Sequence, residues 1–254
     1  MSLFSAMAAL RTMQKLLLTL LALPLAAQAA TGHEVLDRAR IDTQDAVSIQ
    51  RGARVFVNYC LNCHSAQYMR YNRLTDVGLT EQQIRDNLMF AAQKVGDTMT
   101  VAMPRVAAKD WFGVPPPDLS VIARARGADW LYTYLRSYYR DNSTVTGWNN
   151  RVFPNVGMPH VLWELQGRQV LKIEEQAGGA HGEAHKTSLV LESPGTLSPR
   201  EYDVLVADLV NYLVFMGEPG RVRRVQTGYL VLIALGVLFV FVYLLKKEYW
   251  KDVH

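Results

Sequence analysis

The chain has 254 residues, of which 50% are hydrophobic and 20% charged, and its formal net charge is +4. This composition excludes a collagen-like or disordered chain and predicts one main globular domain with additional segments. Residues 30–227 contain 22 Lys and Arg against 21 Asp and Glu, so the positive excess lies at the two ends and we expect no nucleic-acid partner.

Residues 1–29 have the features of an export signal. Arg11 and Lys15 precede an apolar run over residues 16–25, and residues 27–29 read Ala-Gln-Ala, the small residues at which a signal peptidase cleaves. A short buried helix is the alternative. We expect the mature chain to start near Ala30 and its body to be exported.

The first mature segment predicts an amphipathic helix that ends at a cysteine pair. Apolar side chains recur at spacings of three and four residues, which is the period of one helix face. They are Ala46, Ile49, Ala53, Phe56 and Cys60.

The segment Cys60-Leu61-Asn62-Cys63-His64 fits the pattern C-x-x-C-H. In this pattern two thiols add to the vinyl groups of a haem and the adjacent histidine binds the iron. The alternatives are a thioredoxin-like redox pair and half a zinc site, but the chain has only these two cysteines, so it has no second pair for zinc. We expect one covalently attached haem c, with the second ring nitrogen of His64 donating to a backbone carbonyl.

Four further elements are predicted between the haem motif and the C-terminus. Helices are expected at residues 80–90 and 129–139, and extended segments at 161–165 and 188–191 predict a hairpin whose tip is rich in Gly, Ala and His. Ser198 followed by Pro199 marks the start of a helix that Gly217 ends. We expect this helix to cross the first one, because neither can bury its apolar face alone.

The C-terminal segment predicts one membrane-spanning helix. Residues 229–245 carry no charge and are flanked by basic residues on both sides, with Tyr229, Tyr243 and Trp250 near the ends. A buried core helix is the alternative. We expect residues 228–245 to anchor the chain in the lipid bilayer and residues 246–254 to form a cytoplasmic tail.

The sixth position on the iron decides whether such a site carries electrons or performs chemistry, and a thioether there makes a carrier. Four methionines remain as candidates: Met89, Met99, Met103 and Met158. The others lie in the signal, close to His64, or on the apolar face of the helix that Gly217 ends. Met158 lies between Gly157 and Pro159 in a rigid late loop and is preferred, with Met103 second.

These residues together resemble the cytochrome c1 family, the membrane-anchored haem subunits of cytochrome bc1 complexes. The resemblance covers nearly all of the mature chain and is more specific than the haem motif. It rests on Arg51-Gly52, Cys60 to Ser65, Pro116-Pro117-Asp118-Leu119-Ser120, Ile122 to Arg126, Gly157-Met158-Pro159, Asp208 to Leu213 with Gly217-Glu218-Pro219, and the C-terminal span. Some relatives have a second cysteine pair that closes a loop; this chain has none.

The resemblance implies that Met158 is the sixth ligand, that the segment 116–120 packs against the haem and that Arg124 lies near a propionate. It implies a mainly α fold: a cytochrome c-like haem domain with loops and a small β-hairpin, on one transmembrane helix. The haem domain, residues 30–227, would lie in the periplasm on a bacterial inner membrane.

By the same resemblance the chain is not an enzyme by itself. It would accept electrons from a Rieske iron-sulfur protein, pass them to a soluble c-type cytochrome and pack against cytochrome b. The alternatives are a membrane-anchored cytochrome c of another oxidase or dehydrogenase, or a c-haem enzyme such as a peroxidase, for which His160 is the only nearby distal base.

Overall fold

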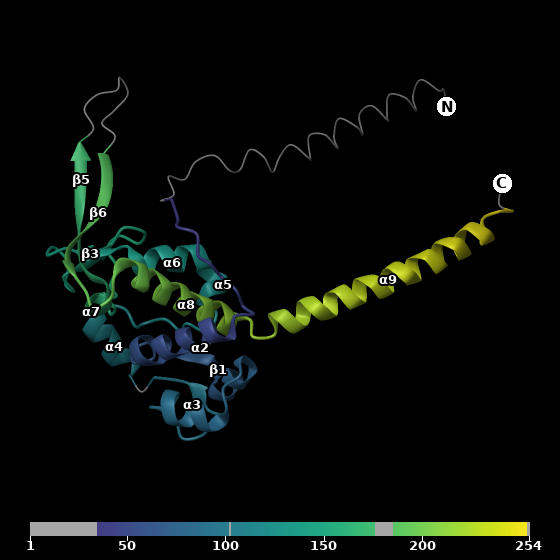
Figure 1. The fold of residues 1–254 in the computed structure, drawn as a ribbon, viewed down its shortest axis with the longest axis horizontal. Coiled ribbons are helices and arrows are strands. Elements are labelled where there is room, and N and C mark those ends of the chain that lie inside the picture. The colour runs from purple at the N-terminus through teal and green to yellow at the C-terminus, as the bar shows by residue number, and fades with distance from the viewer. Residues whose placement is uncertain (1–34, 102, 176–184, 253–254) are drawn as a thin grey trace. The chain divides into compact units, whose positions relative to one another are not determined.

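A computed structural model describes residues 35–101, 103–175 and 185–252, and from Leu36 onward they belong to one compact unit (Figure 1). The expected export signal, residues 1–29, lies outside the described residues. The elements in chain order are α2 (Ala46–Val55), the π-helical turn η2 (Phe56–Cys60), β1 (Ala66–Arg70), the 3-10 helix η3 (Tyr71–Val77), α3 (Glu81–Leu88), β2 (Thr98–Met99), α4 (Arg105–Phe112), α5 (Ile122–Arg126), α6 (Ala128–Arg136), β3 (Tyr138–Arg140), β4 (Trp148–Asn150), α7 (Trp163–Gln166), β5 (Gly167–Glu175), β6 (His185–Pro194), α8 (Pro199–Gly217) and α9 (Arg221–Tyr249).

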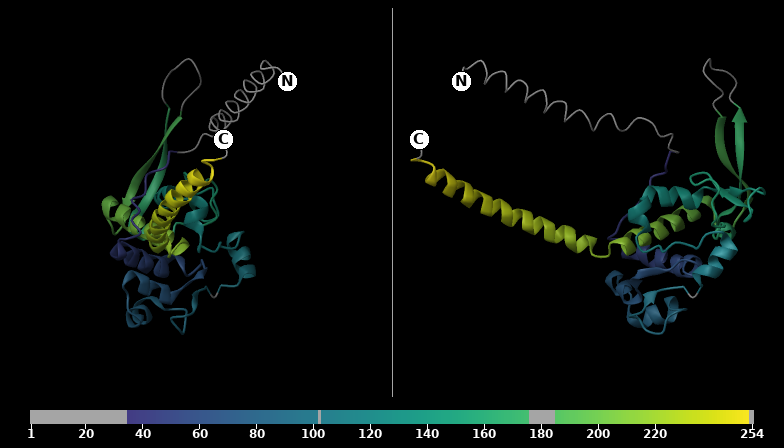
Figure 2. Two further views of the ribbon diagram at one scale, coloured as in Figure 1. Left: turned by 90° about the vertical axis from the view of Figure 1, so that its right-hand side faces the viewer. Right: turned by 180° about the vertical axis from the view of Figure 1, so that it is seen from behind.

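The predicted fold class is confirmed: the described chain is mainly α, with three two-stranded antiparallel sheets. Helices α2 and α8 cross, as the sequence predicts, and lie side by side in each view (Figures 1 and 2). The crossing is close because Gly52 has no side chain: a Cβ there would lie 2.0 Å from the carbonyl oxygen of Asp208. The core forms around this crossing, with Ile49, Phe56 and Tyr212 fully buried.

Two helix starts follow from capping residues that the sequence shows. Ser198 caps α8 and Thr80 caps α3, and in each case the side chain three residues later returns a hydrogen bond to form a capping box. The first predicted helix is also present, although its last turn, η2, is π-helical.

The predicted helix over residues 129–139 is shorter than expected. Helix α6 ends at Arg136, and Tyr138 and Tyr139 instead form β3, which pairs with β4. Aromatic residues suit a strand at least as well as a helix, so the presence of the partner strand β4 decides that these residues form a strand.

The predicted hairpin exists, but its first strand begins later than the predicted segment 161–165. Residues 163–166 form the short helix α7, and the strand begins only at Gly167, which adopts φ 93°. Strands β5 and β6 then pair from Gly167–Pro194 to Glu175–His185. The left-handed turn at glycine separates a helical segment from the strand that follows.

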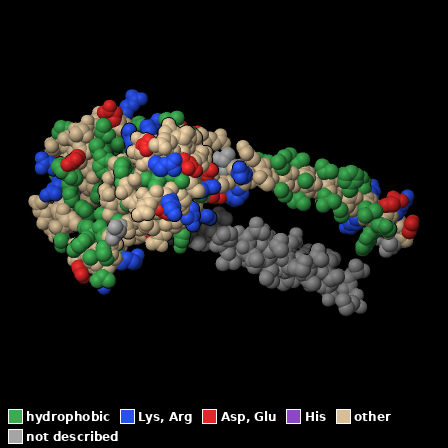
Figure 3. All heavy atoms as spheres, turned by 90° about the horizontal axis from the view of Figure 1, so that it is seen from below, with side chains coloured by type: hydrophobic (Ala, Val, Ile, Leu, Met, Phe, Trp, Pro, Cys, Tyr) green, Lys and Arg blue, Asp and Glu red, His purple; other side chains and the backbone are tan. Residues whose placement is uncertain are grey.

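Helix α9 contains the predicted membrane span. The helix is long and apolar enough between Arg223 and Tyr249 to cross a bilayer, by length and composition. Its apolar side chains are exposed along its length (Figure 3): Leu232 and Phe239, for example, are about two-thirds exposed. An apolar helix surface that no other described residue covers suits a lipid environment.

Candidate functional site

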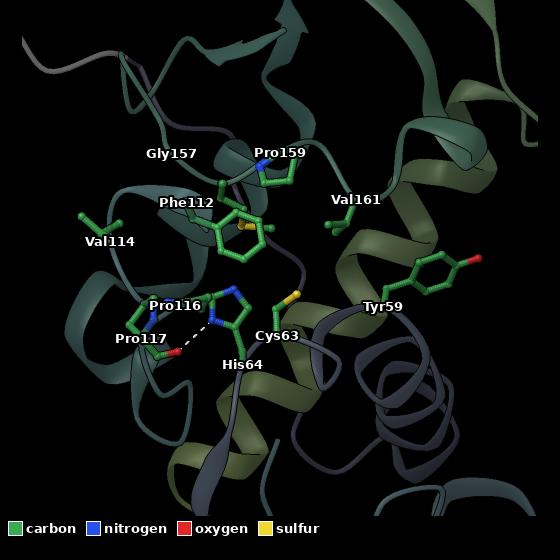
Figure 4. Close-up of a pocket in the computed structure, with 11 residues that line it drawn as sticks. Tyr59, Cys63, His64, Phe112, Val114, Pro116, Pro117, Gly157, Pro159 and Val161 are labelled. Carbon is green, nitrogen blue, oxygen red and sulfur yellow. Dashed lines mark hydrogen bonds between the residues drawn. The ribbon is translucent and has the colours of Figure 1, made fainter. Parts of the chain in front are cut away.

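A cavity lies beside the haem motif and is lined almost wholly by apolar side chains (Figure 4). We call it the His64 cavity. Together with its open mouth it encloses about 580 Å³ of empty space. Its lining residues are Tyr59, Cys63, His64, Phe112, Val114, Pro116, Pro117, Gly157, Met158, Pro159 and Val161.

His64 is buried and has a fixed orientation. Its Nδ1 lies 2.8 Å from the carbonyl oxygen of Pro117 (Figure 4), and because a carbonyl only accepts, Nδ1 carries the proton. Burial lowers the pKa of His64 below its usual value, more than the bond to Pro117 raises it. The ring is therefore neutral at pH 7, with the lone pair on Nε2. The hydrogen bond expected from the sequence is confirmed, and the structure adds that its acceptor is Pro117.

The segment that carries Pro117 is tied to the chain that follows His64. The backbone N–H of Leu119 donates to the carbonyl of Ser65 at 2.8 Å, and the carboxylate of Asp118 accepts from the N–H of Gln67 at 2.8 Å. These contacts hold the Pro-Pro-Asp-Leu-Ser segment against the haem motif, so that Pro116 and Pro117 form part of the cavity wall.

The two cysteines lie on one helical turn, and no disulfide joins them. The carbonyl of Cys60 accepts from the N–H groups of Cys63 and His64 at 3.1 and 2.8 Å. Cys63 lines the His64 cavity, and its sulfur points into it (Figure 4), whereas Cys60 packs against the core and is not part of the lining. Burial, with a smaller contribution from Cys63, raises the pKa of the Cys60 thiol to about 12, and burial also raises the pKa of Cys63.

The four candidate methionines occupy four different surroundings. Met99 is fully buried, and its sulfur accepts from the hydroxyl of Tyr212 at 3.3 Å. Met89 packs against the core, and Met103 lines a separate cavity on another side of Cys63. Only Met158 lines the His64 cavity. The structure thus brings Met158, Cys63 and His64 together and leaves the other three candidates elsewhere.

Hydrogen bonds stiffen the loop that leads to Met158 in place of a disulfide. The carboxylate of Asp141 accepts from the backbone of Ser143 at 3.0 Å and from the side chain of Asn149 at 2.8 Å. The side chain of Asn149 also accepts from the N–H of Asn155 at 2.8 Å. The missing cysteine pair therefore does not leave this loop without internal support.

Sequence reasoning missed two residues at this site. Phe112 ends α4 and lies over His64 in the cavity (Figure 4), and Tyr134 of α6 points its hydroxyl at the sulfur of Met158, 3.5 Å away. No spacing rule connects Tyr134 with Met158, because 24 residues with a hairpin between them separate the two. The sequence places Tyr134 only within the helix predicted over residues 129–139.

His160 and Arg124 lie outside the His64 cavity. His160 is buried, stacked on the ring of Tyr138 at 4.7 Å with its plane 4° away, and burial lowers its pKa to about 4. The ring of His160 thus packs against other aromatic rings, whereas a distal base would face the ligand site. Arg124 is exposed and lines another cavity, with Ile41 and Glu218, and its side chain packs near Gly217.

The residues of the cavity have the chemistry that a haem requires. An apolar wall suits a flat macrocycle, a neutral imidazole with Nε2 free suits iron, and a thioether is a soft sixth donor. A free cysteine faces the same space. In the part of the chain that is described, no group of three or more His, Cys, Asp or Glu could hold a metal ion by itself.

Comparison with known proteins gives a consistent result. The model of the Cytochrome C1 family matches residues 38–170, more than half of the chain. The chain is 51% identical to cytochrome c1 of Allochromatium vinosum over 95% of its own length and all of that protein, and 28% identical to cytochrome c1 of Rhodospirillum rubrum over 82% and 83%. It is also 52% identical to a protein of Nitrosomonas europaea named ammonia monooxygenase gamma subunit, over 96% of this chain and all of that one. The sequence, the cavity and these matches agree, and the chain belongs to the cytochrome c1 family.

Proposed function

We propose that the chain holds one haem c, attached through Cys60 and Cys63, with His64 and Met158 on the iron. One observation carries this proposal: the thioether of Met158 and the free Nε2 side of His64 belong to the same apolar cavity, and Cys63 lines it. Cys60 is included because the C-x-x-C-H pattern requires two thiols, one turn apart.

The function is electron transfer as the haem subunit of a cytochrome bc1 complex, which the family match and the full-length identity favour over the alternatives. Haem c supplies a one-electron couple. The carbonyl of Pro117 fixes the orientation of His64, and the side chains of Phe112, Pro116 and Pro117 keep water from the cavity. The coordination of the iron therefore has little reason to change between oxidation states. The chain is thus an electron-transfer subunit and performs no catalysis by itself.

The direction of transfer and the partners follow from the family. We propose that electrons arrive from a Rieske iron-sulfur protein and leave to a soluble c-type cytochrome, and that α9 packs against cytochrome b in the bilayer. The name of the Nitrosomonas europaea relative supports a second candidate, in which the same haem site serves a monooxygenase assembly. Both give the chain the same site and differ in the proteins that purify with it.

The topology proposed is a signal peptide over residues 1–29, a periplasmic haem domain over 30–227, a membrane anchor over 228–245 and a cytoplasmic tail over 246–254. The family is membrane-anchored, and α9 is compatible with that. The signal pattern supports the periplasmic side. The orientation is tested by fusing, after residue 254, a reporter enzyme that works only in the cytoplasm. The proposed topology predicts an active reporter.

Arg124 remains a proposal that rests on the family resemblance. Its exposed side chain lies on α5, outside the lining of the His64 cavity. If Arg124 pairs with a haem propionate, Arg124→Gln lowers the reduction potential, because a positive charge stabilises the reduced, less positive site. Arg85→Gln, at an exposed position on α3, which contributes no residue to the lining of the His64 cavity, is the control, and equal potentials in the two variants would remove Arg124 from the site.

The ligand assignment is tested by optical spectra of the purified complex. We expect a near-infrared sulfur-to-iron band in the oxidised wild type, lost in Met158→Leu together with a fall in potential, and kept in Met103→Leu. Carbon monoxide binding should appear in Met158→Leu alone. A wild type without the band, or a band that survives Met158→Leu, would show that the ligand set is wrong.

A further inference from the structure

The hydroxyl of Tyr134 is the one polar group that the structure places on the sulfur of Met158 within the described residues. The oxygen-to-sulfur distance is 3.5 Å, and a thioether can only accept. Most of the cavity wall near Met158 is apolar, with Val161, Pro159 and Phe112 contributing carbon atoms. A hydroxyl at this place is therefore not a general feature of the lining.

Packing holds Tyr134 in this position. Its ring stacks on Trp130 with 4.8 Å between centroids and an angle of 11° between planes, and it meets the edge of Tyr138 at 5.3 Å. Only 9% of Tyr134 is exposed. With a ring on two sides, the side chain has little room to turn, so its hydroxyl stays directed at Met158.

A second tyrosine fixes the direction of the hydrogen bond. The hydroxyls of Tyr134 and Tyr138 lie 2.5 Å apart, and each has one proton. If Tyr134 donates its proton to the sulfur of Met158, Tyr138 must donate its own proton to the oxygen of Tyr134. Both hydroxyl protons then have an acceptor. Burial raises the pKa of both hydroxyls, so both stay protonated at neutral pH.

We propose that Tyr134 is a positioning residue for Met158: its hydroxyl, supported by Tyr138, orients the thioether in the His64 cavity and raises the reduction potential of the site. A hydrogen bond to a ligand sulfur withdraws electron density from it, which disfavours the oxidised, more positive state of the metal centre. The inference rests on the proposed role of Met158 as the sixth ligand.

The test uses Tyr134→Phe in the purified complex, with Tyr132→Phe as the matched control. Tyr132 lies on the same helix, and its ring is covered by Arg136 rather than by Met158. Phenylalanine keeps the ring of Tyr134 and its packing, so folding is preserved. We expect Tyr134→Phe to lower the potential by up to the equivalent of a tenfold change in the reduction equilibrium, about 59 mV for one electron.

The near-infrared band separates this role from a structural one. In Tyr134→Phe the band should persist, because Met158 still binds, but move in wavelength; in Tyr132→Phe band and potential should match the wild type. Tyr138→Phe should give a smaller shift in the same direction, since Tyr134 keeps its proton and loses only its support.

The outcomes also separate the two proposals. If Met158→Leu removes the band while Tyr134→Phe leaves both band and potential unchanged, the ligand assignment holds and the role of Tyr134 is refuted. If Met158→Leu keeps the band, the ligand assignment itself is wrong, and the Tyr134 proposal falls with it. A potential that rises in Tyr134→Phe would contradict the predicted direction.

Discussion

The side chain of Asn150 ties the Met158 loop to the backbone of Tyr134. Its Nδ2 donates to the carbonyl oxygen of Tyr134 at 2.7 Å, and its Oδ1 accepts from the N–H groups of Val152 and Phe153 at 2.9 and 3.1 Å. Asn150 is fully buried, so water does not compete for these bonds. Helix α6 therefore holds the sulfur of Met158 through the hydroxyl of Tyr134 and the preceding loop through its carbonyl.

Asn150→Ala should loosen this loop. It leaves the N–H groups of Val152 and Phe153 without their acceptor, at about 1–3 kcal/mol for each that stays unpaired, while the carbonyl of Tyr134 keeps the N–H of Ser137. We expect a lower free energy of unfolding in urea, and a fraction of the oxidised protein without the near-infrared band. Asn142→Ala, at an exposed position in the same loop, is the control. Equal unfolding curves for the two variants would mean that Asn150 does not support the loop.

Gly52→Ala should disrupt the crossing of α2 and α8. The added Cβ would lie 2.0 Å from the carbonyl oxygen of Asp208 and 2.7 Å from Cβ of Tyr212, so one helix must move. Overpacking of this kind costs about 1–3 kcal/mol or more, and here a backbone atom is in the way. Thermal unfolding measures it. Gly96→Ala, where an added Cβ would meet no described atom within 4 Å other than those of its chain neighbours, should behave as wild type.

Local signals predicted the parts of the fold that depend on neighbouring residues in the sequence. Ser198 and Pro199 marked the start of α8, the spacing from Ala46 to Cys60 marked α2, and the adjacent His64 made the cysteine pair specific. In each case the physical cause lies within one or two helical turns, as with a cap or an apolar face.

The parts that sequence reasoning missed depend on contacts between distant segments. The early end of α6 reflects the pairing of Tyr138 with Asn150, and the contact between Tyr134 and Met158 exists only once β3 and β4 have turned the chain back. The sequence predicts that a backbone carbonyl accepts the hydrogen bond of His64. That this carbonyl belongs to Pro117 depends on the hydrogen bonds of Asp118 and Leu119. Such tertiary pairings leave no periodic pattern in the sequence.

Asp208→Ala should destabilise the protein more than the loss of a surface ion pair. The Asp208 side chain is 9% exposed and accepts from Ser48 at 2.7 Å and from Arg51 at 2.5 Å. Because Arg51 is 47% exposed, it regains water, and we expect a loss of about 1–3 kcal/mol rather than that of a fully buried pair.

Asp76→Ala is the matched control for Asp208→Ala. Asp76 pairs with Arg73 at 2.6 Å, but both side chains are more than a third exposed, so the pair contributes about 0–1 kcal/mol. Urea unfolding of both variants gives the comparison. If Asp76→Ala cost as much as Asp208→Ala, burial would not explain the strength of the Arg51 contact.

Ser198→Ala removes the cap of α8. The hydroxyl of Ser198 accepts from the N–H of Glu201 at 3.4 Å and donates to its carboxylate at 2.7 Å. Loss of such a cap costs about 1 kcal/mol. Since α8 packs against α2, the helix that leads to the haem motif, the loss should appear in the global unfolding of the protein. Thr196→Ala, exposed and just outside the helix, should leave the unfolding transition unchanged.

The same cap should make stability depend on pH in the acidic range. Hydrogen bonds from the side chain and the backbone N–H of Ser198 lower the pKa of Glu201 below its usual value of 4.5. The folded state therefore holds the carboxylate more tightly than the unfolded state does. The stabilisation from the ionised Glu201 is complete above the usual pKa of glutamate and is lost as the pH falls through the lowered pKa of the folded state.

Glu201→Gln provides the comparison, because glutamine keeps the capping geometry but does not titrate. We expect the difference in unfolding free energy between wild type and Glu201→Gln to be constant from about pH 7 to pH 5 and to shrink as the pH falls further, where Glu201 takes up a proton. Acid titration of urea unfolding measures this. A difference that stays constant into the range where Glu201 is protonated would show that the charge of Glu201 contributes nothing to the cap.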